Sequence, residues 1–252
     1  MSRPTAGGAT AVVIPARLAA TRLPRKPLLP IAGEPMIVQV WRRAIEAGVG
    51  PVFVACADAE IVDAVRAAGG EAVLTDPALP SGTDRVNEAI RKVDPQGRFA
   101  RVINLQGDMP TLDPTVLRLV LEPLDALAVD IGTLANATED EHERTDPNVV
   151  KAIVSFPPER PRLGRALYFT RATAPTGPGP VYHHIGIYAF DRATLERFCA
   201  LPPSPLEQRE RLEQLRGLEA GMSIGVRLVD AVPFGVDTPA DLEKARRILE
   251  SR

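Results

Sequence analysis

The sequence predicts an α/β fold with a mostly parallel sheet, and two patterns along the chain support this prediction. In the first half of the 252 residues, short apolar runs alternate with amphipathic helical patterns, as in βα units that build a parallel sheet with helices on both faces. In the second half, extended segments follow one another without intervening helices, which predicts an antiparallel insertion at about residues 149–218. We expect residues 1–252 to form a single domain, with a loose tail at about residues 1–9.

The elements of the first half follow from apolar spacing and from end signals. Asp58 is expected to cap the second helix, while Gly48 and the pair Gly69-Gly70 end the first and second helices. Asp113-Pro114 begins the last helix of this half. The expected strands are 11–14, 52–55, 72–74 and 102–105, and the expected helices are 35–45, 58–68, 83–93 and 113–124.

The second half is expected to contain the insertion and a final helix. Asp191 caps a short helix, Ser204-Pro205 begins a helix through about residue 218, and Thr238-Pro239 begins the last helix. Such an insertion could cover an active site or form a dimer face. The expected extended segments are 149–156, 166–170, 184–190 and 224–232.

Composition and charge exclude several classes of protein. A net charge of -2 and an aromatic content of 4% argue against a nucleic-acid platform, which needs basic and aromatic surface. The apolar runs are far shorter than the ~20 residues of a membrane span, and Pro15 and Arg17 interrupt the first one, so we expect neither a membrane segment nor a signal peptide. Cys56 and Cys199 are far apart and outside any metal-type motif, which favours reduced thiols in a cytoplasmic protein.

A basic, proline-stiffened loop follows the first expected strand. In an open α/β sheet, ligands bind beyond the carboxyl ends of the strands, and guanidinium and ammonium groups placed there suit a polyphosphate. The loop lacks both the Walker pattern and GxGxxG, and a solvated basic loop is the alternative interpretation. Its cations are Arg17, Arg22, Arg25 and Lys26, and its prolines are Pro15, Pro24 and Pro27.

Two aspartates, Asp108 and Asp237, are each expected to follow the end of a strand. Gly107 precedes the first and allows a sharp turn, while Thr238-Pro239 follows the second and begins a helix. Two carboxylates at this edge could jointly hold Mg²⁺ against nucleotide phosphates, because hard cations prefer oxygen ligands. The alternative roles are a turn residue for Asp108 and a helix cap for Asp237, although Thr238 suits the cap better.

Further motifs occur in a fixed order along the chain. They are IPAR at 14–17, TRLP at 21–24, KPL at 26–28, SGTDR at 81–85, QGD at 106–108, residues 166–175, HIGIY at 184–188, PSPLE at 203–207, residues 212–216 and GVDTP at 235–239. Each motif is weak alone, but the ordered set is specific. It resembles the 3-deoxy-manno-octulosonate cytidylyltransferases, also called CMP-Kdo synthetases, from about residue 11 to the last helix.

The resemblance implies a Rossmann-like nucleotidyltransferase fold and an enzyme that transfers CMP from CTP to 3-deoxy-manno-octulosonate (Kdo), releasing pyrophosphate. It also implies Mg²⁺ as the cofactor, a homodimer, and a product used for lipopolysaccharide biosynthesis in a Gram-negative bacterium. The expected catalytic residues are Arg17 and Lys26, facing the pyrophosphate, with Asp108 and Asp237 holding Mg²⁺. The expected nucleotide-binding residues are Pro15, Ala16, Arg17, Lys26, Ser81, Gly82, Thr83, Arg85, Gln106 and Asp108, and the expected sugar-binding residues are Gln106, Arg171, His184, Tyr188, Glu213 and Gln214.

Two positions depart from the family pattern. The usual Gly before the loop lysine is Arg25, which adds a cation beside the phosphates, and the usual Glu after the strand-end aspartate is Met109. Alternative functions are a cytidylyltransferase for another acidic sugar, such as the 8-amino Kdo analogue or a sialic acid, and a catalytically silent CTP-binding protein. The presence of both Asp108 and Asp237 favours the active enzyme.

Overall fold

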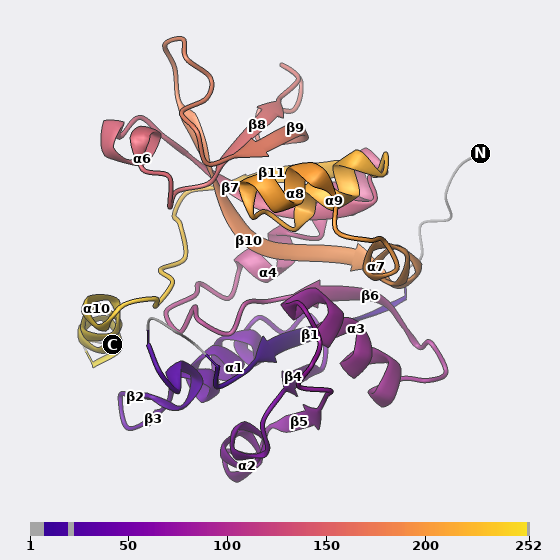
Figure 1. Ribbon diagram of the computed structural model, residues 1–252, viewed down its shortest axis with the longest axis vertical. Helices are drawn as coiled ribbons and strands as arrows, with labels where there is room; N and C mark the ends of the chain where they lie inside the picture. The colour runs from indigo at the N-terminus through magenta and orange to yellow at the C-terminus, as the bar shows by residue number, and fades with distance from the viewer. Residues whose placement is uncertain (1–7, 20–22, 251–252) are drawn as a thin grey trace. The chain divides into compact units, whose positions relative to one another are not determined.

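The computed structural model describes residues 8–19 and 23–250, which divide into two compact units (Figure 1). The terminal unit comprises the described residues of 8–118 and 233–250, and the central unit comprises residues 119–232. Each unit is described separately. No helix within 8–19 and 23–250 is both long and apolar enough to cross a membrane.

The terminal unit is built on parallel strands in the order β5-β4-β1-β6. Val12 of β1 pairs with Val52 of β4, and Val13 pairs with Asn104 of β6, so β1 is hydrogen-bonded on both sides. The apolar centre of β1 is completely buried, as expected for a strand in a parallel sheet. The strands are β1 (Ala9–Ala16), β4 (Val52–Cys56), β5 (Glu71–Leu74) and β6 (Phe99–Asn104), which confirms all four predicted strands of the first half.

Helices of this unit connect the parallel strands. Ser81 caps α3 through a hydrogen bond from the Asp84 amide at 3.1 Å. The predicted cap at Asp58 is wrong, because its carboxylate instead accepts from the Leu18 amide at 2.8 Å and fixes the basic loop. The helices are α1 (Met36–Glu46), α2 (Ala59–Ala67) and α3 (Gly82–Val93), with the 3-10 turn η1 (Lys26–Leu28) and the short strands β2 (Pro30–Ile31) and β3 (Glu34–Pro35) before α1.

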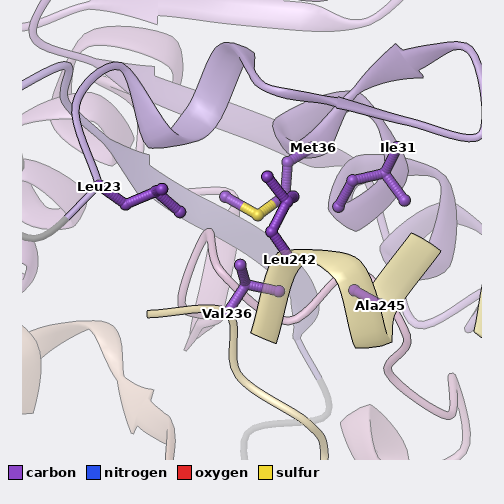
Figure 2. Packing of buried hydrophobic residues seen from close by; sticks show 6 residues of the cluster. All are labelled: Leu23, Ile31, Met36, Val236, Leu242 and Ala245. Carbon is purple, nitrogen blue, oxygen red and sulfur yellow. The ribbon is translucent and has the colours of Figure 1, made fainter. Parts of the chain in front are cut away.

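The C-terminal helix α10 (Pro239–Glu250) belongs to the terminal unit and packs beside β2 (Figure 1). Figure 2 shows apolar side chains of the two ends of the chain in contact. Burial of this cluster removes a large apolar area from water, which holds α10 and the loop before it in place. The cluster consists of Leu23, Ile31, Met36, Val236, Leu242 and Ala245.

The central unit has a mixed sheet in the order β10-β7-β11-β9-β8, and β8 also pairs with β10. β7 and β11 are parallel, whereas the other pairs are antiparallel. The predicted extended segments correspond to β8 (Lys151–Ser155), β9 (Leu163–Thr170), β10 (Val181–Asp191) and β11 (Ile224–Val229). The strand β7 (Ile131–Thr138) was not predicted, because Gly132 and Asn136 weaken its strand pattern.

Two long helices predicted from the sequence are each broken. The helix expected at 113–124 is divided into α4 (Val116–Leu119) and α5 (Glu122–Leu127), and Pro123 lies in the first turn of α5, where its missing N–H is tolerated. The helix expected from Ser204 to about 218 is divided into α8 (Pro205–Glu210) and α9 (Gln214–Glu219), because Arg211 adopts a left-handed conformation with φ 57°. The remaining helices are α6 (Glu141–Thr145) and α7 (Arg192–Cys199).

Neither Cys56 nor Cys199 forms a disulfide among the described residues. Cys56 is buried at the end of β4, and burial raises the pKa of its thiol to about 12. A thiol with such a pKa is inert near neutral pH.

Candidate active site

A cavity of about 400 Å³ lies in the terminal unit at the carboxyl ends of β1 and β6. The register of the two strands ends at Val13 and Asn104, after which the Leu105 amide donates to the Val13 carbonyl at 3.1 Å. Beyond this point the two chain segments supply side chains to the cavity, which is the usual ligand position in an open α/β sheet. It is lined by Pro15, Ala16, Arg17, Ala19, Leu23, Lys26, Pro27, Ser81, Gly82, Arg85, Gln106, Gly107, Asp108 and Asp237.

Arg17 and Arg85 give the cavity a positive wall. The buried Arg85 guanidinium donates to the Thr75 hydroxyl at 2.6 Å and to the Asp76 carbonyl at 3.0 Å, and neither acceptor is charged. Burial lowers the pKa of Arg85, and the neighbouring charge of Arg17 lowers it further. A bound anion would relieve this repulsion, so the wall suits a phosphate chain.

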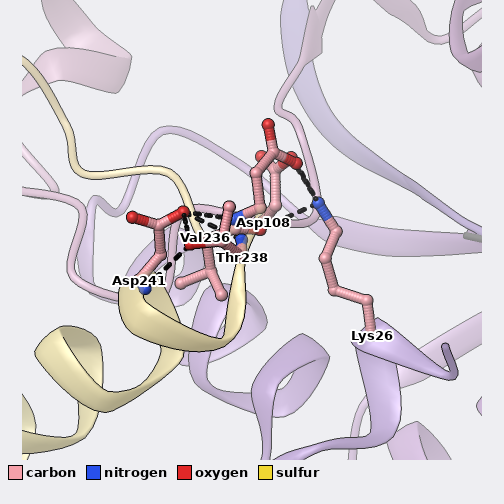
Figure 3. A network of polar contacts seen from close by, with 6 residues as sticks. Lys26, Asp108, Val236, Thr238 and Asp241 are labelled. Carbon is pink, nitrogen blue, oxygen red and sulfur yellow. Dashed lines mark hydrogen bonds and ion pairs between the residues drawn. The ribbon is translucent and has the colours of Figure 1, made fainter. Parts of the chain in front are cut away.

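The opposite side of the cavity is organised by Lys26, at the start of η1 (Figure 3). Its ammonium group donates to Asp108 Oδ2 at 3.0 Å, to Asp237 Oδ1 at 2.9 Å and to the Val236 carbonyl at 2.9 Å. An ammonium group has three N–H donors, so each one has an acceptor. Burial alone lowers the pKa of Lys26, but the two carboxylates outweigh it and the pKa is raised. Lys26 therefore stays protonated.

The pair of Asp108 and Asp237 has the chemistry of a magnesium site. Both carboxylates are within 3.0 Å of a single cationic atom, Lys26 Nζ, and so converge on one point. Mg²⁺ is commonly held by one or two carboxylates, with water and substrate phosphates completing the shell. The part of the chain that the structure describes contains no group of three or more His, Cys, Asp or Glu side chains that could hold a metal ion. The two residues present therefore fit this ion.

The loop before α3 forms another side of the cavity. Gly82 lies so close to Pro15 that a Cβ atom would be 3.3 Å from the Pro15 ring, which leaves backbone groups exposed to a ligand. Gln106 donates to the Asn104 side chain at 3.3 Å. Thr83 does not line the cavity. Its buried hydroxyl instead accepts a hydrogen bond from the side-chain Nδ2 of Asn104 at 3.2 Å. Its expected contact with nucleotide stays a prediction.

A separate polar cluster in the central unit contains several of the expected sugar-binding residues. The buried His184 ring lies 5.6 Å from the ring of Tyr188, centroid to centroid, and its Nε2 is 3.1 Å from the Thr133 hydroxyl. Burial, with a smaller effect of His183, lowers the pKa of His184 to about 3. Burial and then the charge of Glu213 raise the pKa of Tyr188. Both rings are therefore neutral near pH 7 and can only donate or accept hydrogen bonds.

Gln214 lies next to Glu213 at the start of α9 and supplies a further polar group. Its Nε2 is buried and has no hydrogen-bond partner among the described residues, and such a donor is costly unless a ligand satisfies it. Arg171 lies just after β9, and its guanidinium donates to the carbonyls of Glu210 and Pro147, both at 2.9 Å. Its side chain is thus used within the protein, and its expected sugar contact stays a prediction.

Of the two remaining cations of the basic loop, the described residues include Arg25. Arg22 lies outside the described residues. Arg25 has a left-handed backbone with φ 57° and forms a two-point ion pair with Glu60 of α2, so it does not line the cavity as an added cation. No sequence pattern points to the Val236 carbonyl, because every residue has a carbonyl group and only the fold turns this one toward Lys26. Met109, the second departure, is half-buried and does not line the cavity.

The parallel sheet, the basic wall and the paired carboxylates define the class of protein as a nucleotidyltransferase-type α/β fold. The sequence model of the cytidylyltransferase family matches residues 11–224. The 3-deoxy-manno-octulosonate cytidylyltransferase of Parvibaculum lavamentivorans is 66% identical over 241 residues, which are 96% of this chain and 93% of that protein. The enzyme of the same name from Paramagnetospirillum magneticum is 61% identical over 240 residues, which are 95% and 97% of the two chains. The chain therefore belongs to the 3-deoxy-manno-octulosonate cytidylyltransferase family.

Solved structures agree with this assignment. The chain matches a CMP:2-keto-3-deoxy-manno-octonic acid synthetase complexed with CTP with a TM-score of 0.88 and 40% identity, covering 96% of this chain and 99% of the other. A cytidylyltransferase from Leptospira borgpetersenii matches with a TM-score of 0.62 at 14% identity, covering 97% and 88%, and supports the fold alone. The predicted α/β nucleotidyltransferase fold is thereby confirmed.

Proposed function

We propose that this protein transfers CMP from CTP to Kdo, forming CMP-Kdo and releasing pyrophosphate. The observation that carries the proposal is the convergence of Lys26, Asp108 and Asp237 at the edge of a cavity whose other wall is cationic. The names of the highly identical relatives support the choice of CTP and Kdo. The printed CTP complex of a 40% identical synthetase supports the nucleotide.

The reaction forms a bond between the anomeric oxygen of the sugar and the α-phosphorus of CTP, while the bond to pyrophosphate breaks. Arg17 and Lys26 bind the phosphates and neutralise the charge that develops on the leaving pyrophosphate. Asp108 and Asp237 would hold Mg²⁺, and the bound ion would polarise phosphate oxygens and lower the pKa of the attacking hydroxyl. Since each Lys26 donor already has an acceptor, its contact with a phosphate requires it to release one of them.

The remaining residues hold the two substrates. The cavity-lining residues Ser81, Gly82 and Arg85 bind the base and ribose, and Gln106, which also lines the cavity, is our candidate for contact with both substrates. For the sugar we propose the polar cluster of the central unit around the buried His184, together with Arg171. Neutral donors and acceptors suit the hydroxyl groups of a sugar, and the buried amide of Gln214 matches a hydroxyl acceptor. The proposed sugar residues are Gln106, Arg171, His184, Tyr188, Glu213 and Gln214.

We also propose a homodimer, a cytoplasmic location and a product that is used for lipopolysaccharide biosynthesis. These three statements rest on the family to which the chain belongs. We retain the interpretation of residues 1–252 as one functional domain, in which both compact units serve a single reaction.

The test is a pyrophosphate-release assay with the purified protein. We expect release with CTP and Kdo together, little release with either substrate alone or with other nucleotides, and loss of release when a chelator removes divalent cations. Competition with the 8-amino analogue and with a sialic acid tests the choice of sugar. Absence of release with CTP and Kdo would contradict the proposal and favour the silent CTP-binding alternative. Equal turnover in the presence of a chelator would instead overturn the proposed role of the divalent cation and leave the transferase activity in place.

A further inference from the structure

Asp241, in the first turn of α10, makes contacts that the proposed reaction does not use (Figure 3). Its Oδ2 atom accepts from the Asp237 amide at 3.1 Å, from the Thr238 amide at 2.8 Å and from the Thr238 hydroxyl at 2.8 Å. In return, the Asp241 amide donates to the Thr238 hydroxyl at 3.2 Å. One carboxylate oxygen therefore collects three donors from the two residues that precede the helix.

This arrangement does more than cap a helix. A capping box needs only the reciprocal bonds between the residue before the helix and the third helical residue, and here Thr238 and Asp241 supply them. The additional bond from the Asp237 amide lies one residue further out and fixes the backbone of the proposed metal ligand itself. Bonds to an ionised acceptor are the stronger kind.

The backbone before Asp237 is fixed from the other side. The Val236 amide donates to the Asp108 carbonyl at 2.9 Å, and the Val236 carbonyl accepts from Lys26. The Val236 side chain is completely buried in the cluster of Figure 2. Asp237 thus lies between two fixed points, of which Asp241 provides the one on the helix side.

We propose that Asp241 is a positioning residue that holds Asp237 in the geometry needed to bind the divalent cation, an inference that rests on the proposed function. A carboxylate ligand can only complete a metal site if its backbone is held at the right distance from the other ligands. Without Asp241, the backbone amides of Asp237 and Thr238 and the Thr238 hydroxyl lose their shared acceptor. Asp237 would then sample positions away from Asp108.

The test uses Mn²⁺ as the probe and the full chain saturated with CTP but without Kdo. Water proton relaxation enhancement reports Mn²⁺ that is held by the protein rather than by free CTP. We expect Asp241→Ala to weaken the apparent Mn²⁺ affinity and to lower kcat by about 10-fold or more, as loss of a residue behind a metal ligand commonly does. The KM for CTP should change less, because the cavity wall of Arg17 and Arg85 is untouched.

Two further variants separate positioning from simple helix capping. Ala240→Gly weakens the same exposed first turn through helix propensity without removing a side-chain contact, so it should lower Tm comparably while leaving Mn²⁺ affinity near that of the wild type. Asp241→Asn keeps a side-chain oxygen that can accept these bonds and should restore most of the affinity. Asp241→Ser also removes the carboxylate. It is used in place of Asp241→Ala if the alanine variant does not fold.

The outcomes distinguish this inference from the proposed function. Equal Mn²⁺ affinity and kcat in Asp241→Ala and Ala240→Gly would overturn the positioning role and leave Asp241 as a cap only. Asp237→Asn in the same titration tests the metal assignment, and unchanged Mn²⁺ binding there would overturn both the assignment and the inference. A loss in Asp237→Asn without a loss in Asp241→Ala would overturn the inference alone.

Discussion

Single residues decide the chemistry at the edge of the sheet, and the strand-end aspartates are the first to test. Asp108→Asn and Asp237→Asn keep shape and hydrogen-bonding ability but lose the anionic charge that a metal needs. We expect turnover to fall by on the order of 100-fold or more, roughly 3 kcal/mol of transition-state stabilisation. Tm should change little, because Lys26 retains its other acceptors. Near-normal turnover in both variants would contradict the metal assignment and would leave Asp108 as a turn residue and Asp237 as a helix cap.

Arg25 gives a second prediction at this scale. Its guanidinium pairs with Glu60 on an exposed surface, where ion pairs contribute little to stability, and its φ of 57° suits glycine. Arg25→Gly should therefore leave Tm and the KM for CTP close to those of the wild type. Arg17→Ala, at a position that lines the cavity, is the matched control and should raise KM or lower kcat. A large rise in KM in Arg25→Gly would instead show that Arg25 contacts phosphate.

His184 predicts how stability depends on pH. Its pKa is lowered from 6.5 to about 3 by burial and then by His183, so below about pH 6.5 the unfolded chain binds a proton that the folded protein does not. Stability is therefore complete above about pH 6.5 and decreases as pH falls from there toward 3. In urea titrations at about pH 7 and pH 5, the free energy of unfolding should fall more steeply in the wild type than in His184→Gln. If the free energy of unfolding falls equally between pH 7 and pH 5 in both proteins, His184 is not the cause of the pH dependence.

At the scale of whole elements, α10 couples the two ends of the chain to the site. Leu242 is buried against Met36 and Ile31, and the same segment carries Asp237. Leu242→Ala should cost about 2–4 kcal/mol of unfolding free energy and should lower turnover at temperatures where α10 detaches. Urea unfolding and kcat measured across temperature test this. Leu74→Ala, at a leucine that is 52% exposed, is the control and should change neither.

The sequence predicted most elements of the terminal unit, because its strands are continuous apolar runs and its helices end at glycines. It failed where tertiary contacts override local pattern. β7 contains a glycine and an asparagine, yet its first five residues are buried between neighbouring strands. Arg211 divides a predicted helix through a backbone conformation that nothing in its side chain signals.

The candidate site was also predictable only in part, because local sequence pattern does not show which distant groups come into contact. Strand-end reasoning predicted that Asp108 and Asp237 lie together, and the structure brings both within 3.0 Å of Lys26 Nζ. The strand expected directly before Asp237 is wrong, because β11 ends at Val229 and Asp237 lies in the irregular segment before α10. The engagement of Arg171 with two backbone carbonyls was not predictable, because such contacts depend on the path of distant loops. Its role with sugar, like those of the other site residues, stays a prediction.

For the whole molecule, the proposed homodimer is the property most easily measured. Leu167 of β9 is an apolar side chain that is 62% exposed, and we choose it to test whether the antiparallel half contributes to the dimer contact. Light scattering at micromolar concentration should give twice the mass of one chain, and Leu167→Glu should weaken the association. A monomeric mass for the wild type would count against the dimer. If Leu167→Glu and Leu167→Arg both dimerise with the affinity of the wild type, the interface lies elsewhere.

The three acceptors around Lys26 also have a consequence for the order of binding. A divalent cation competes with the ammonium group for the same carboxylate oxygens, and the oxygens of a triphosphate compete with those carboxylates for the ammonium group. On the proposed roles of these residues, each ligand would remove the obstacle to the other, so that nucleotide would raise the affinity for metal and metal would raise the affinity for nucleotide by the same factor. Cooperativity between nucleotide and metal would then follow from the position of one lysine that is bonded to two carboxylates.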